Sequence, residues 1–223
     1  SEKLFIKKRI YEALSEVESY DRKKVKLLFS SHHLSHAASS FFCSPFEKAA
    51  IVTIDGVGEW DTATIGIGNQ NNITIVKEMH FPHSVGLLYS SFTYFLGFKV
   101  NSGEYKLMGL APYGQKDDSE TKEFISIIKS KLVSIKEDGS IWLDQNYFEY
   151  AYGLRMVNDQ KWSHIFGFSK RNETDEILQC HCNLALAIQM VTEEIVLKMA
   201  NEAIKITGLI ALCISGGVAL NCV

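Results

Sequence analysis

"AAIVTIDGVGEWDTATIGIGNQNNITIVKEMHF", residues 49–81, contains three consecutive segments with the pattern of β-strands. The first, AAIVTI, is rich in β-branched residues and runs into Asp55 and two glycines, whereas DTATIGIG and NITIVKEMHF alternate and are separated by the polar turn NQNN. Branched residues and alternation are typical of strands, and polar turn residues join antiparallel neighbours. The stretch therefore predicts a three-stranded meander, with Asp55 at the end of its first strand.

Apolar patterns on either side of the meander predict further helices and strands. Helical periodicity covers residues 2–18, 32–41, 85–98, 119–135 and 175–206. Short apolar runs predict buried strands at residues 24–29 (KVKLLF) and 209–217 (LIALCISGG). Glycines punctuate NSGEYKLMGLAPYG, residues 101–114, which predicts a loop with ligand contacts, and residues 137–169 support no assignment. The pattern indicates the α/β class, with a mixed sheet and flanking helices.

Composition excludes several classes of protein. The 223 residues are 46% hydrophobic, which allows a large core, and 23 basic residues against 26 acidic ones leave no basic tract beyond KKVK, so nucleic acid is not an expected partner. No apolar segment reaches the roughly 20 residues of a membrane helix, and the polar start is not a signal peptide, so we expect a cytoplasmic protein. Five cysteines without a CxxC pair favour reduced thiols, and the CHC of residues 180–182 favours a buried helical face over a zinc site.

The stretch HHLSHAASSF, residues 32–41, holds the candidate metal ligands. On a helix His32 and His36 project from one face about one turn apart, which is the spacing of a two-histidine metal site. Asp55 at a strand end is the natural third ligand, and such a set suits Fe(II), Zn or Mn acting as a Lewis acid. The alternative is that these are ordinary histidines with satisfied hydrogen bonds. His33 lies off the axis of the pair and is interpreted as a supporting residue.

Four other residues near glycines are candidates for binding. Gly56 and Gly58 would let a ligand approach the backbone closely. Glu59 and Asp61 could be acid/base groups, although carboxylates at a tight turn are also ordinary turn chemistry, and Glu59 is also grouped with the cofactor-binding residues. Lys106, between two glycines, could reach a phosphate or be a solvated lysine. His80 and His83 flank a Phe-Pro pair and are given no role.

Four motifs, taken in order, resemble a known family. They are HHLSHAASSFFCSPFEKAAIVTIDGVGEWDTATIGIG, NSGEYKLMGLAPYG, AIQMVTEEIVLKMA and ISGGVALNCV. Together they look like the carbamoyltransferases typified by nodulation protein U and the O-carbamoyltransferases of antibiotic biosynthesis. The match spans roughly residues 30–223 except the irregular middle.

This resemblance implies an actin-like ATPase fold of two ribonuclease H-like lobes, with nucleotide and metal between them. It also implies a reaction, in which carbamoyl phosphate and ATP give a carbamoyl adenylate and the carbamoyl group passes to a hydroxyl of a sugar or antibiotic. Carried over by position, the metal ligands fall on His32, His36 and Asp55. The nucleotide contacts fall on Gly56, Gly58, Gly216, Gly217 and Asn221.

The chain departs from the family pattern at both ends. The opening strand with its HDASA-like motif and the later aspartate of the metal site are absent, the chain begins without Met, and it stops at Val223 just after the glycine pair. We therefore expect residues 1–223 to be a partial amino-terminal carbamoyl-transfer domain, truncated at both ends, comprising the first lobe and the start of a second near residues 209–223. The segment alone should be inactive without the remainder of its chain.

Two rival functions stay open. A tRNA threonylcarbamoyl transferase shares the fold, but GEYKLMGLAPYG is the small-molecule form of the loop and no basic stripe is visible. The second rival is a module that binds nucleotide or metal and catalyses no reaction. The acceptor alcohol and the oligomeric state do not follow from the sequence.

Overall fold

The computed structural model describes residues 5–223, which divide along the chain into two compact units, one ending at Ser31 and the other beginning at His32. In the first unit, α1 (Ile6–Val17) confirms most of the helix predicted for residues 2–18, of which residues 2–4 lie outside the described part. Tyr11 ties this unit together, because its hydroxyl donates to the Val25 carbonyl at 3.0 Å and its own carbonyl accepts from the Tyr20 hydroxyl at 2.8 Å.

The strand predicted for residues 24–29 is wrong. These residues form no ladder, and the side chains of Leu28 and Phe29 are 78% and 59% exposed. A strand needs a hydrogen-bonded neighbour, and a local apolar run carries no information on whether one will be present.

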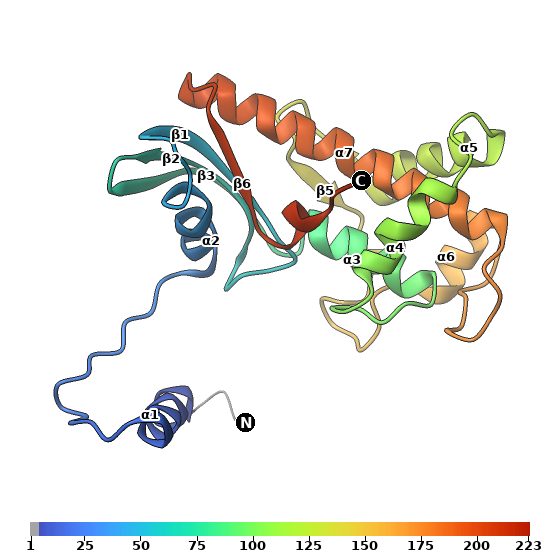
Figure 1. Ribbon diagram of the computed structural model, residues 1–223. Helices are drawn as coiled ribbons and strands as arrows, with labels where there is room; N and C mark the ends of the chain where they lie inside the picture. Colours follow the sequence, from blue (N-terminus) through green and yellow to red (C-terminus); the bar gives the residue numbers. More distant parts are fainter. Residues whose placement is uncertain (1–4) are drawn as a thin grey trace. The chain divides into compact units, whose positions relative to one another are not determined.

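The second unit, His32–Val223, is built on a four-stranded mixed sheet in the order β3-β2-β1-β6 (Figure 1). Its strands are β1 (Lys48–Ile54), β2 (Asp61–Asn69), β3 (Asn72–His80) and β6 (Leu212–Ser215). β1, β2 and β3 pair antiparallel, which confirms the predicted meander, and β6 pairs parallel with β1. The α/β class with a mixed sheet is therefore confirmed.

Alternation along β1 decides what covers each face of the sheet. Ala49 and Ile51 pack with Ala37 and Phe41 of α2 (His32–Phe41), whereas the intervening β1 side chains join the larger core with the helices of the other face. That core includes α3 (Val85–Phe95) and the 29-residue α7 (Gln179–Thr207). Both helices agree with the sequence pattern, and α7 ends at Gly208 as predicted. Within the unit His32–Val223, α2 therefore covers one face of the sheet, and α3 and α7 pack on the other.

Further helices and strands lie between α3 and α7 in the sequence. They are α4 (Glu104–Leu110), η2 (Ala111–Tyr113), α5 (Ser119–Ile127), η3 (Ile128–Leu132), β4 (Val133–Ile135), β5 (Ile141–Leu143) and α6 (Asp159–Phe166). The stretch 137–169 packs around the buried ring of Trp162, which contacts Phe92, Phe95 and Phe148. No helix within residues 5–223 is long and apolar enough to cross a membrane.

Two further predictions need correction. Residues 104–110 were expected in a loop but form α4, because Leu107 and Leu110 are buried three residues apart while Gly109 lies on the exposed side. The predicted strand near residues 209–217 exists as β6, but it is an edge strand in which only Cys213 is buried. β6 pairs with β1 in this same sheet, at the place where we expected a second lobe to begin.

Candidate functional site

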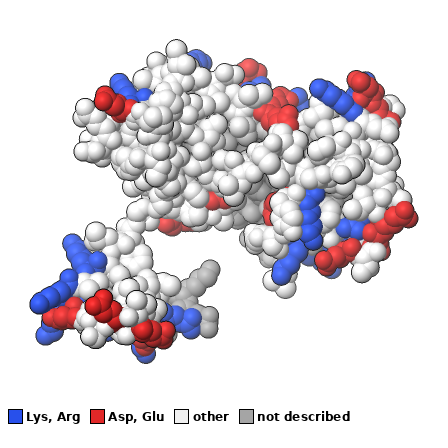
Figure 2. All heavy atoms as spheres, viewed as in Figure 1, with Lys and Arg blue, Asp and Glu red and all other residues white. Residues whose placement is uncertain are grey.

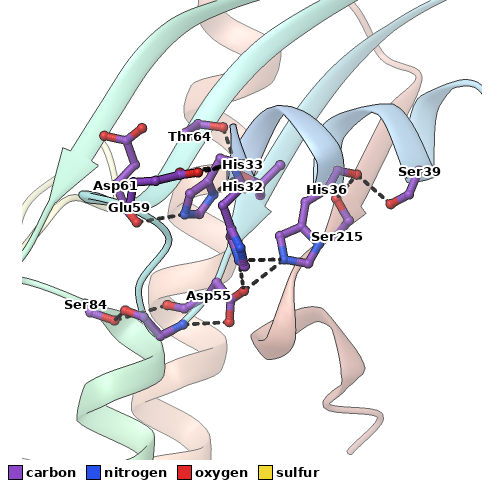
Figure 3. Close-up of polar contacts among 12 residues, drawn as sticks. His32, His33, His36, Ser39, Asp55, Glu59, Asp61, Thr64, Ser84 and Ser215 are labelled. Carbon is purple, nitrogen blue, oxygen red and sulfur yellow. Dashed lines mark hydrogen bonds and ion pairs between the residues drawn. The ribbon is translucent and has the colours of Figure 1, made fainter. Parts of the chain in front are cut away.

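The site begins where α2 meets the end of β1. The His32 amide donates to both carboxylate oxygens of Glu59, at 3.2 and 3.0 Å, so Glu59 accepts at the amino terminus of α2. At the first turn of the helix this satisfies an amide without an intrahelical partner. The Ser215 hydroxyl donates to the His36 carbonyl at 2.8 Å, which ties β6 to the same helix. Together, these two contacts hold the face of α2 that carries His32 and His36 over the end of β1 (Figure 3).

Three side chains converge at this end of β1. Asp55 Oδ2 lies 2.7 Å from His32 Nε2 and 2.9 Å from His36 Nε2, and the two Nε2 atoms are 3.0 Å apart (Figure 3). Donor atoms bound to one Zn or Fe ion at about 2.0–2.2 Å lie about 3 Å from one another. The donor set and its spacing therefore fit a divalent metal. All three side chains are partly exposed, so the cluster has open sides.

The backbone around Asp55 is held independently of the histidines. The Ser84 hydroxyl donates to the carbonyls of Asp55 and Gly56, at 3.1 and 2.6 Å, and accepts from the Leu87 amide at the start of α3. Burial by itself would raise the pKa of Asp55, but hydrogen bonds from His32, the Gly56 amide and His36 outweigh it and hold that pKa below its usual range. The carboxylate is therefore ionised at neutral pH, as a metal ligand must be.

His33 supports the helix from inside. Its ring is 3% exposed, with Nδ1 2.6 Å from Thr53 Oγ1 and Nε2 2.9 Å from the Asp61 carbonyl. Because a carbonyl can only accept, Nε2 donates to Asp61 and the neutral ring accepts at Nδ1 from Thr53. Burial lowers the pKa of His33, which agrees with a neutral ring. The predicted supporting role of His33 agrees with this geometry.

The glycine pair after β6 lies against Asp55 and the end of β1. Gly216 has φ +100°, and a Cβ there would clash with the Ile54 carbonyl oxygen. A Cβ on Gly217 would lie 2.7 Å from Asp55 Oδ1. Only glycine allows this approach. Gly58 is packed differently, since its Cβ would lie 3.0 Å from the side chains of His32 and His33, whereas a Cβ on Gly56 would meet nothing within 4 Å.

A cavity of about 350 Å³ opens beside Asp55. Its lining includes four of the residues predicted from sequence, which are Asp55, Gly56, Gly217 and Asn221. The volume falls within the range of small-molecule sites, roughly 300–1,000 Å³. Glu59, Lys106, Gly58 and Gly216 do not line it, and Lys106 is exposed on α4.

Sequence reasoning missed several residues of this cavity. Tyr89 and Ser90 come from α3, and Glu104 and Met108 come from α4. The glycine-rich spacing of residues 101–114 indicated the segment but not which side chains face inward, because the helical register of α4 was not recognised.

A pair of amide side chains, one of them buried, fixes Asn221. Gln189 of α7 is 2% exposed and exchanges hydrogen bonds with the Asn221 side chain at 3.0 and 2.8 Å. Its oxygen also accepts from the Tyr89 hydroxyl at 3.0 Å. Through this pair, α7 and α3 hold the turn η4 (Gly217–Leu220) that carries the cavity wall.

The Cys180, His181 and Cys182 group lies at the start of α7, as predicted for a helical face. His181 is 6% exposed, and its Nδ1 accepts from the Leu178 amide at 2.9 Å. It therefore caps the helix.

Comparison with known proteins shows the family to which the chain belongs. A family model described as carbamoyltransferase N-terminus matches residues 1–223. The uncharacterized protein sll1178 of Synechocystis is 48% identical over 223 residues, which is 100% of this chain and 35% of that protein. Nodulation protein NolNO of Sinorhizobium fredii is 31% identical over 199 residues, covering 88% of this chain and 26% of its own length.

Nodulation protein NolO of Bradyrhizobium diazoefficiens is 29% identical over 194 residues, covering 86% of this chain and 32% of that protein. The chain thus spans about a third or less of the length of these relatives. The match over the full chain shows that it belongs to the carbamoyltransferase family, to whose N-terminal region it corresponds.

Proposed function

We propose that this chain is part of an ATP- and metal-dependent O-carbamoyltransferase. It would move a carbamoyl group from carbamoyl phosphate, via carbamoyl adenylate, to a hydroxyl of a sugar or antibiotic-like small molecule. Family membership supports the reaction type. One observation carries the metal-dependent part of the proposal. His32 Nε2, His36 Nε2 and Asp55 Oδ2 lie within 3.0 Å of one another beside a cavity.

The three ligands would hold a divalent metal, with Fe(II) preferred and Zn or Mn as alternatives. A bound metal supplies Lewis-acid polarisation of a carbonyl or phosphoryl oxygen. The protein contributes the positioning of its donors, because His33 fixes α2 against β1 and Ser84 fixes the backbone of Asp55. Supporting contacts of this kind set ligand orientation and metal affinity.

The cavity would place the reacting groups next to the cluster. In the transfer step the acceptor oxygen bonds to the carbamoyl carbon, the bond from that carbon to the adenylate oxygen breaks, AMP leaves and the hydroxyl proton passes to solvent. Gly56, Gly217 and Asn221 would contact the nucleotide side, since all three line the cavity at its Asp55 end. Holding both reactants in one cavity would supply the proximity that group transfer needs.

An actin-like ATPase fold is part of this proposal. Three antiparallel strands extended by a parallel fourth, with helices on both faces, are compatible with one ribonuclease H-like lobe. Residues 1–223 would then be a partial amino-terminal carbamoyl-transfer domain, completed by the rest of the chain.

A small hydroxylated acceptor is favoured over tRNA. On the face seen in Figure 2, basic and acidic side chains are interspersed. A tRNA-binding surface would instead gather lysine and arginine into a stripe.

Transfer itself can be tested by mass spectrometry. The intact protein is incubated with ATP, carbamoyl phosphate, Fe(II) and a library of hydroxyl compounds, and products are screened for the mass of one added carbamoyl group. We expect such a product, dependent on ATP and on carbamoyl phosphate. No carbamoylated small molecule, together with modification of tRNA, would move the protein to the tRNA-modifying class. Nucleotide or metal binding without any transfer would indicate a binding module.

A further inference from the structure

Three hydroxyl side chains form a row across the sheet, beneath the first turns of α2. Thr64 of β2 lies opposite Thr53 of β1, and Thr53 lies opposite Ser215 of β6. Thr53 and Thr64 are only 0% and 4% exposed. Because buried hydroxyls between a helix and a sheet need hydrogen-bond partners, the partners of this hydroxyl row show what it holds in place.

The hydrogen bonds of the two threonines run in one direction, toward α2. Thr53 Oγ1 lies 2.6 Å from His33 Nδ1 and 2.7 Å from Thr64 Oγ1 (Figure 3). His33 Nδ1 is an acceptor, since Nε2 donates to the Asp61 carbonyl, so Thr53 donates its single proton to His33. Thr64 must then donate to Thr53. This chain of hydrogen bonds fixes both the tautomer and the orientation of the His33 ring.

Ser215 holds the next turn of the same helix. Its hydroxyl donates to the His36 carbonyl at 2.8 Å (Figure 3). His33 and His36 are three residues apart, which is about one helical turn. The hydroxyl row therefore grips α2 at two successive turns, which are the turns that carry His32 and His36.

Apolar packing does not provide the same constraint. Ala37 and Phe41, farther along α2, pack against apolar side chains of β1 and against Cys213. Such contacts are non-directional, whereas hydrogen bonds weaken steeply when their distance or angle changes. A metal site requires its donor atoms to stay within a few tenths of an ångström of their positions. Hydrogen bonds at the first turns are thus the contacts that can set the orientation of His32 and His36.

We propose that Thr64 and Thr53 are positioning residues for the metal ligands and act through His33, while Ser215 positions the second turn. None of the three touches the metal or the substrate. Breaking one link lets the first turns of α2 shift against Asp55, which weakens metal binding although every ligand is still present. The inference rests on the proposed function, in which His32, His36 and Asp55 hold a divalent metal.

Zinc affinity of the intact protein tests this role without requiring catalysis. Competition with a chromophoric chelator is measured at a temperature at which every variant is folded. Thr64→Val keeps the shape of the side chain but removes the hydroxyl, and it should weaken zinc binding about tenfold, as loss of supporting contacts does. Thr64→Ser restores the hydroxyl and should bind zinc as the wild type does.

A matched control separates positioning from general stability. Thr192 of α7 is 3% exposed, and its hydroxyl donates to the Ile188 carbonyl at 2.8 Å. Thr192→Val removes a buried, hydrogen-bonded hydroxyl in another element and should leave zinc affinity unchanged. An equal loss of zinc affinity in Thr192→Val and Thr64→Val would overturn the positioning role.

Two further measurements report how the hydroxyl row acts. Thr53→Val breaks the contact with His33 directly, so adding Thr64→Val to it should cause no further loss of zinc affinity. Cobalt(II) bound in place of zinc reports coordination geometry through its visible absorption, which should change in Thr64→Val and not in Thr192→Val. Additive losses of affinity or an unchanged cobalt spectrum would contradict action through His33.

Ser215→Ala gives an independent test, at the partly exposed end of an edge strand. It should weaken zinc binding by a smaller factor than Thr64→Val, because the His36 carbonyl keeps the Ser39 hydroxyl as a donor. Wild-type zinc affinity in folded Ser215→Ala and Thr64→Val proteins would overturn the proposal.

The outcomes also separate this inference from the proposed function. Zinc binding that depends on Thr64, without any carbamoyl transfer, would reject the proposed function alone. Transfer with zinc binding that does not depend on Thr64 would reject the positioning role alone. A wild-type protein that binds no metal would reject both the metal-dependent function and the positioning role.

Discussion

Within residues 5–223, two groups of side chains have the composition of a metal site, yet they are built differently. His32, His36 and Asp55 join one helix face to the end of β1. Asp61, Glu78 and His80 join two antiparallel strands, with Asp61 directly opposite His80 and their side chains 2.8 Å apart. In each group the donor atoms lie within 4.8 Å of one another.

Their surroundings separate the two groups. The members of the first are all partly buried, and Asp55 lines the cavity, whereas Glu78 and His80 of the second are exposed on β3. The first group is also braced by His33 and Ser84. Both groups contain metal-binding residue types with donor atoms close together. The supporting contacts from His33 and Ser84 and the adjoining cavity therefore favour the first group as the functional centre.

Removing one histidine from each group gives the largest expected contrast. In the intact protein, His36→Ala should weaken metal binding by at least about a hundredfold, because a direct ligand contributes more than the supporting contacts whose loss already costs 10–100-fold. Metal content by inductively coupled plasma mass spectrometry and carbamoyl transfer should fall together.

The matched control is His80→Ala, which removes a histidine that also contacts an aspartate. It should leave stoichiometric metal in place. If His80→Ala releases the metal while His36→Ala retains it, the two groups have been assigned the wrong way round.

A substitution in the glycine pair, Gly216 and Gly217, tests whether the cavity beside Asp55 binds nucleotide. Gly217→Val places a Cβ 2.7 Å from Asp55 Oδ1 and narrows the cavity, so ATP affinity by isothermal titration should drop roughly tenfold. Gly109→Ala is the control, because a Cβ at that exposed helical position meets nothing within 4 Å. It should raise the free energy of unfolding by about 0.5–1 kcal/mol and leave ATP affinity unchanged. Equal ATP affinity in a folded Gly217→Val protein would mean that the pair is only a turn.

The smallest expected effect is on stability and concerns Asp138, a carboxylate outside both groups. It serves as a reference for a carboxylate that is paired with a lysine. Its Oδ2 accepts from Lys77 Nζ at 2.7 Å, and its Oδ1 accepts from the Ser140 hydroxyl at 2.6 Å. Burial opposes ionisation, but the bonds from Lys77 and Ser140 outweigh it and lower the pKa of Asp138. Asp138→Asn should therefore reduce the free energy of unfolding at pH 7, by about 1 kcal/mol or less because the ion pair is partly exposed to solvent.

The pH dependence of that difference has a definite sign. A carboxylate whose pKa is lower in the folded state stabilises the protein above its unfolded pKa, near 4, and that contribution is lost as pH falls toward the folded pKa. Urea unfolding at neutral and acidic pH should show the gap between wild type and Asp138→Asn narrowing below about pH 4. A gap that widens on acidification would contradict the assignment. Chelator should not alter the gap, since the partner of Asp138 is lysine.

Part of the site could be predicted because its signals are local. His32 and His36 are spaced by one helical turn, and Asp55 directly follows a β-branched run, so neighbouring residues alone indicated both elements. Their convergence was inferred from chemistry and agrees with the structure. Glu104 and Ser90 carried no such signal, since a carboxylate near glycines has the same local pattern whether it faces a cavity or solvent.

The sequence by itself determined the meander, most of helices α1, α2, α3, α5 and α7, the helix end at Gly208 and the family to which the chain belongs, because periodicity, turn residues and motifs are properties of short segments. Only the tertiary structure decided that residues 24–29 form no strand, that β6 is an edge strand paired with β1, and which side chains line the cavity. Each of these depends on which distant segment supplies a hydrogen-bond partner or covers a face. That information lies in the packing of the whole unit and not in the residues of any one segment.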